Sequence, residues 1–143
     1  MRCYTYSLIA SLSWGLYYPL VEKLLGRFSV VFVLILSQLL PALAASLLFH
    51  RQVAQDITQL DQIDSNDWVM ISVVPIISLV ANGLSYLAIR QKNASFVAFI
   101  EIAYPLFILI FTYVLFKEFQ LTTISIVGAL LILVGVIVLL TAG

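Results

Sequence analysis

Charged residues are scarce in this chain: Asp, Glu, Lys and Arg make up 10% of its 143 residues. Soluble globular domains usually contain about 25%. The seven basic residues are balanced by seven acidic ones, so the chain has no net positive charge of the kind that attracts a nucleic acid. These values exclude an ordinary soluble enzyme and predict no nucleic-acid partner.

Cysteine and histidine are nearly absent as well. The chain has one cysteine, Cys3, and one histidine, His50, and the two do not have the spacing of metal ligands. The sequence also lacks a phosphate-binding loop, a dinucleotide-binding glycine motif, a zinc-protease motif and a nucleophile elbow. It therefore predicts no cofactor, no metal site and no enzymatic activity.

Apolar residues dominate what is present, at 63% of the chain. They form five long runs, which predict helices at about 4–25, 29–49, 68–90, 95–117 and 121–141. About 20 apolar residues suffice to cross a bilayer as a helix, and the runs do not alternate as the strands of a membrane barrel do. Five such helices also have too little polar surface for a soluble bundle. We expect an all-α polytopic membrane protein with five transmembrane helices in a single domain, residues 1–143.

One long connection, the loop 50–67, separates the second and third runs. Val53, Ile57 and Leu60 recur there at helical spacing, so part of it could form a short helix in the membrane interface. The alternatives for its function are a solvated connector and an acidic patch, since the segment also contains four aspartates: Asp56, Asp61, Asp64 and Asp67.

The basic residues do not predict one orientation in the membrane. Cytoplasmic loops usually carry an excess of Lys and Arg. Here three lie on one side (Arg2, Arg51 and Lys117) and four on the other (Lys23, Arg27, Arg90 and Lys92). This even division favours insertion in both orientations, or a partner that fixes one of them.

Each of the first four runs contains one proline: Pro19, Pro41, Pro75 and Pro105. A proline removes a backbone donor and kinks a helix. In a membrane the freed carbonyl is tolerated where a neighbouring helix or a water-filled cavity satisfies it. We expect four helix kinks, with a bundle that encloses a cavity and kinking alone as the two alternatives.

Glu101 is the strongest candidate for a functional residue because it lies inside the fourth apolar run. A carboxylate in hydrocarbon costs a few kcal/mol and usually faces the bundle interior, pairs or becomes protonated. Tyr104 follows at helical spacing, on the same face. We expect Glu101 and Tyr104 to bind substrate or couple proton movement; a structural hydrogen bond of Glu101 to another helix is the alternative.

Three further polar or aromatic residues are candidates to line the same cavity: Trp14, Tyr18 and Asn82. An aromatic pair can stack on a flat or cationic substrate. Polar side chains such as Asn82 also join helices to one another in lipid, which is the alternative for each of them.

The fifth run contains Gly128 and Gly135, seven residues apart on one helix face. Small residues allow helix backbones to approach closely. This face is therefore expected to be an oligomer interface and not a wall of the binding cavity.

Several short segments occur in a specific order along the chain: Ser13-Trp14-Gly15, Ala94-Ser95, Tyr104-Pro105, residues 115–118 with Glu118 at the end of the helix, residues 126–132, and Gly135-Val136. Together these segments resemble the EamA-type domain of the drug/metabolite transporter superfamily. An arginine common in the second helix of the family is replaced near Gln38.

The resemblance implies a five-helix unit, half of an inverted-repeat transporter of the bacterial cytoplasmic (inner) membrane that moves a small metabolite or drug. It implies a dimer, either an antiparallel homodimer, as in related small multidrug transporters, or a complex with a separate partner half. The predicted function is alternating-access transport, with proton coupling through Glu101. The alternative is a non-transporting membrane scaffold or regulatory subunit of a partner protein.

Overall fold

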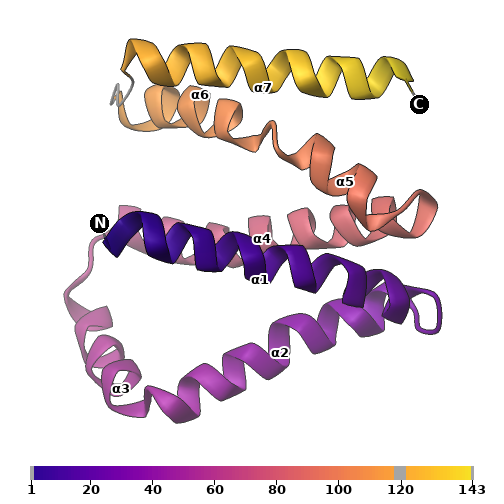
Figure 1. Cartoon of the computed structure of the whole chain (residues 1–143). Coiled ribbons are helices and arrows are strands. Elements are labelled where there is room, and N and C mark those ends of the chain that lie inside the picture. Colours follow the sequence, from indigo (N-terminus) through magenta and orange to yellow (C-terminus); the bar gives the residue numbers. More distant parts are fainter. Residues whose placement is uncertain (1, 118–121, 143) are drawn as a thin grey trace. The chain divides into compact units, whose positions relative to one another are not determined.

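The computed structural model describes residues 2–117 and 122–142, and every element within them is a helix (Figure 1). Two positions named from the sequence lie outside the described residues. They are Glu118, at the expected end of the fourth helix, and Leu121, at the expected start of the last one. The helices in chain order are α1 (Arg2–Leu25), α2 (Val30–Leu48), α3 (His50–Gln59), the 3-10 helix η1 (Leu60–Gln62), α4 (Ser65–Gln91), α5 (Ala94–Glu101), α6 (Tyr104–Phe116) and α7 (Thr123–Ala142).

Three segments of the described chain are long and apolar enough to cross a membrane: Val30–Leu48, Ser65–Gln91 and Ala94–Phe116. The residues searched in α7 form a shorter apolar helix, Ile126–Thr141. The all-helical membrane fold is therefore confirmed, while the count of five membrane-spanning helices stays a prediction.

Most of the apolar side chains in these segments are exposed. Val33 is the buried residue of α2, and no residue of α6 is buried. Leu47, near the end of α2, is 77% exposed. Soluble proteins rarely expose contiguous apolar surface on this scale, so the exposed faces fit a hydrocarbon environment.

The chain forms two compact units, residues 1–91 and 92–143; the single domain 1–143 stays a prediction. In the first unit α1, α2 and α4 contact one another. From the turn that follows α1, α2 departs from α1 and α4 toward α3 (Figure 1). The buried side chains of this unit are Val21, Leu25, Val33, Tyr86 and Ile89.

In the second unit α5 contacts α7. Ala94 and Val97 of α5 are buried, as is Val136 of α7. Both Gly128 and Gly135 of α7 are exposed, and a methyl group added to either would meet no atom within 4 Å. The small-residue face of α7 is thus open within a single chain.

Side chains define where several helices begin. Ser29 Oγ accepts from the Phe32 amide at 3.2 Å, and Asn93 Oδ1 accepts from the Phe96 amide at 2.7 Å. These are N-cap bonds, which satisfy donors at the first turn of a helix. The segment 50–67 is largely helical rather than an open loop, because α3 and η1 occupy most of it.

The fourth apolar run is not one continuous helix. α5 ends at Glu101 and α6 begins at Tyr104, with Pro105 in its first turn. Proline lacks the amide that would donate to the carbonyl of residue 101 in a continuous helix. Pro19, Pro41 and Pro75 have the same chemistry, yet α1, α2 and α4 continue past them.

We predict that Pro105→Ala joins α5 to α6, because alanine restores the missing amide donor. Spin labels at Phe99 and Tyr113, in a Cys3→Ser background, report the change. Their backbones should move toward a separation of about 21 Å, the length of 14 residues of straight helix.

Ile108→Ala, which adds no backbone donor, is the matched control and should leave the distance unchanged. An unaltered distance distribution in Pro105→Ala would show that another interaction breaks the helix.

Candidate functional site

A chain of hydroxyl groups connects the three long helices of the first unit. The Tyr86 hydroxyl of α4 donates to Ser37 Oγ of α2 at 2.9 Å, and Ser37 Oγ donates to the Leu34 carbonyl at 2.9 Å. The hydroxyls of Tyr17 on α1 and Tyr86 are also hydrogen-bonded. Since a phenol has one proton to donate, Tyr17 donates to Tyr86.

Helix spacing explains why these groups meet. Leu34 and Ser37 lie one turn apart on α2, and Gly83 and Tyr86 lie one turn apart on α4. A methyl group at Gly83 would touch the Leu34 side chain at 3.7 Å, so α2 and α4 pack directly together here. Tyr86 is 2% exposed, and its hydroxyl needs the partners that it has.

Trp14, Tyr17 and Tyr18 form an aromatic cluster on α1. Through Tyr17, this cluster adjoins the series of hydrogen-bonded hydroxyls. The Trp14 and Tyr17 rings are 5.3 Å apart with an edge-to-face geometry, and Trp14 and Tyr18 are 5.9 Å apart. Offset and edge-to-face pairs at these distances are favourable. Trp14 is exposed, whereas Tyr17 and Tyr18 are half-buried.

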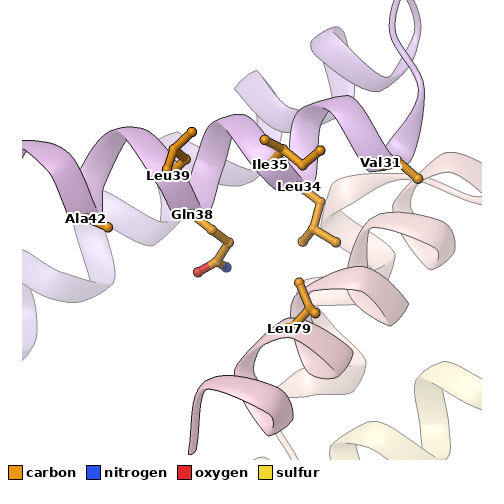
Figure 2. Close-up of a pocket in the computed structure, with 7 residues that line it drawn as sticks. All are labelled: Val31, Leu34, Ile35, Gln38, Leu39, Ala42 and Leu79. Atoms are coloured by element: carbon orange, nitrogen blue, oxygen red, sulfur yellow. The ribbon is translucent and has the colours of Figure 1, made fainter.

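An open pocket of about 580 Å³ lies between α2 and α4 (Figure 2). Leu34 and Leu79 point toward one another across it, and the Gln38 amide extends from α2 into the same space. The remaining lining residues are apolar and belong to α2: Val31, Ile35, Leu39 and Ala42. The lining can therefore accommodate a largely apolar group beside a single amide.

The residues predicted to line a cavity occupy different places. Trp14 and Tyr18 come together in the aromatic cluster. Asn82 lies on α4 in the same unit, where its side-chain amide donates to the Ser78 carbonyl at 2.8 Å. Glu101 and Tyr104 belong to the second unit, at the two ends of the helix break; Glu101 is half-buried and Tyr104 exposed.

Tyr17, Ser37 and Tyr86 were not predicted as a group from the sequence. Tyr86 lies one turn after Asn82, and Tyr17 one turn after Trp14, so helical spacing alone could have added both to the candidate faces. Which hydroxyls meet across helices depends on how each helix is rotated, and a single sequence does not give that rotation.

The described helices and their polar contacts define a multi-pass helical membrane protein with an apolar pocket between two of its helices. The family model described as the EamA-like transporter family matches residues 1–141, and the chain belongs to this family. The resemblance to the EamA-type domain is thereby confirmed. The comparisons with curated proteins and with solved structures found no match.

As a member of this family, the chain is a protein of the lipid bilayer. The family consists of transporters, which implies a small-molecule substrate. The function of the chain therefore concerns movement of a solute.

We predict that Tyr86→Phe lowers the free energy of unfolding by about 1–2 kcal/mol. The substitution removes two hydrogen bonds between helices, each worth about 0.6 and at most about 1.7 kcal/mol in membrane proteins. Unfolding in mixed micelles measures the change.

Tyr4→Phe removes the same hydroxyl from a side chain that is 76% exposed and should have no effect on stability. Equal stability of the two variants would contradict a role for the hydrogen bonds of Tyr86.

Proposed function

We propose that the chain forms one half of a carrier that moves a small metabolite or drug across the bacterial cytoplasmic membrane by alternating access. The observation that supports this most directly is the pocket between α2 and α4, in a chain of a transporter family. Its volume of about 580 Å³ lies within the range of small-molecule sites.

In this proposal all five predicted segments cross the membrane, including α1 and α7. α1 is 24 residues long, and Glu22 and Lys23 lie in its last turn, where side chains reach the interface. α7 has 20 residues without a charged side chain, which is the length that a bilayer requires.

Substrate contacts come from the pocket and from the aromatic cluster. Trp14 and Tyr18 offer ring faces for stacking, and Asn82 offers a half-buried side-chain amide. Gln38 places its amide in the pocket. A site of this kind selects a flat, largely apolar molecule with a few hydrogen-bonding groups.

Glu101 supplies the coupling to protons. It is the last residue of α5, at a break inside an otherwise apolar segment. Transporters commonly place substrate and coupling-ion sites where a membrane helix is discontinuous, and ionisable residues at such depth typically mark ion pathways. Tyr104, the first residue of α6, lies on the other side of the break.

The complete carrier contains two five-helix halves in opposite orientations, which an inverted-repeat architecture requires. Two copies of the chain, inserted both ways, satisfy this as an antiparallel homodimer; a separate partner half is the other composition. The open face of α7 around Gly128 and Gly135 supports close helix packing between the halves.

We predict that Glu101→Gln abolishes solute-driven proton movement, since glutamine has no exchangeable acidic proton. Proteoliposomes that contain the purified chain and a pH-sensitive dye are exposed to a panel of metabolites and drugs. Compounds that change the internal pH with the wild-type chain should fail with Glu101→Gln, and Glu101→Asp should retain part of the response.

The oligomeric state of Glu101→Gln, measured in parallel, separates this proposal from the alternative. A scaffold or regulatory subunit would move no compound, and Glu101→Gln would alter assembly instead. Transport without any effect of Glu101→Gln would remove proton coupling from the proposal.

We further predict that Gly135→Leu weakens association of the two halves, because leucine prevents close backbone approach. Analytical ultracentrifugation in detergent should show a shift toward single chains. Leu130→Ala, which shortens a side chain that is 55% exposed on the opposite side of the same helix, is the control and should leave association intact. An unchanged dimer in Gly135→Leu would place the interface elsewhere.

A further inference from the structure

The two halves of α2 are held very differently. The first half packs against α4, through buried Val33, the approach of Leu34 to Gly83, and the hydrogen bond between Ser37 and Tyr86. Every residue of the second half, residues 41–48, is exposed. We call the first half, which begins at Val30 and ends close to Ser37, the anchored half.

Pro41 stands at the boundary between these halves. In a regular helix the amide of residue 41 donates to the carbonyl of residue 37, and proline has no amide to donate. The residue that loses this bond is Ser37, whose side chain joins α2 to α4. Sharp helix bends occur at prolines for this reason.

The pocket extends across the same boundary. Leu34 and Ile35 line it from the anchored half, whereas Leu39 and Ala42 line it beyond Ser37. Gln38 lies between them, with its amide in the pocket (Figure 2). Bending of α2 between Ser37 and Pro41 would change the width of the pocket and leave the contacts of the anchored half in place.

We propose that residues 41–48 of α2 are a gate for this pocket, hinged between Ser37 and Pro41, and that Tyr86 is the positioning residue that anchors the hinge. Tyr17 supports Tyr86 by donating to its hydroxyl. The inference rests on the proposed transport function and specifies which element opens the binding pocket.

Two pairs of spin labels test the hinge in a Cys3→Ser background, in nanodiscs of phosphatidylethanolamine and phosphatidylglycerol. Labels at Leu47 and Val74 report the gate, and labels at Phe32 and Leu87 report the anchored half; all four side chains are exposed. The gate pair should give a broad distance distribution and the anchored pair a narrow one.

Pro41→Ala should reduce the width of the gate distribution by about half, because a restored backbone bond stiffens α2, with no change in the anchored pair. Tyr86→Phe should broaden the anchored pair. Ser37→Ala removes the same contact from the α2 side and should do so as well, which keeps the test valid if Tyr86→Phe does not fold. Pro19→Ala and Tyr4→Phe are the controls.

A narrow gate distribution in the wild-type chain, or no effect of Pro41→Ala on it, would overturn the hinge. A broadened gate pair with an unchanged anchored pair in both Tyr86→Phe and Ser37→Ala would overturn the anchoring role of Tyr86. Neither result bears on transport itself, which the proteoliposome measurement tests separately.

Discussion

Hydrocarbon offers no hydrogen-bond partner to a hydroxyl or a backbone amide, so a polar group within a membrane protein needs a partner from the protein. In the first unit this constraint is met by a directed series of bonds from Tyr17 to Tyr86, to Ser37 and to the Leu34 carbonyl. Among the described residues no buried side-chain oxygen or nitrogen lacks a partner. The series ends on a backbone acceptor, and it joins α1, α2 and α4.

The same constraint explains why the breaks in the helices matter. A proline that removes a backbone bond is costly in lipid unless other groups compensate. At the interruption before Tyr104 and at Pro41, the helices therefore lack backbone hydrogen bonds and are locally less stable. One lies beside the acidic Glu101, and the other lies beside the pocket that contains Gln38. In the proposed carrier the first serves coupling and the second serves access.

An all-helical membrane fold could be predicted from the sequence, because long apolar runs bounded by charges reflect bilayer thickness. The sequence predicts less of what depends on contacts between helices. Pro105 predicts a kink, but the full break at residues 102–103 follows only from the structure. Trp14 and Tyr18 were candidates, whereas their neighbour Tyr17 provides the bond to another helix. Periodicity identifies the residues of one face, but the partner of that face follows only from tertiary packing.

In the proposed carrier, two oppositely oriented copies of this chain complete the transporter. A fluorescent reporter that is active only in the cytoplasm and an enzyme reporter that is active only outside it, each fused to the C-terminus, test that claim directly. We expect comparable signal from both fusions, in keeping with the even division of basic residues between the two sides of the membrane. Signal from one fusion alone would contradict the antiparallel homodimer and require a separate partner half.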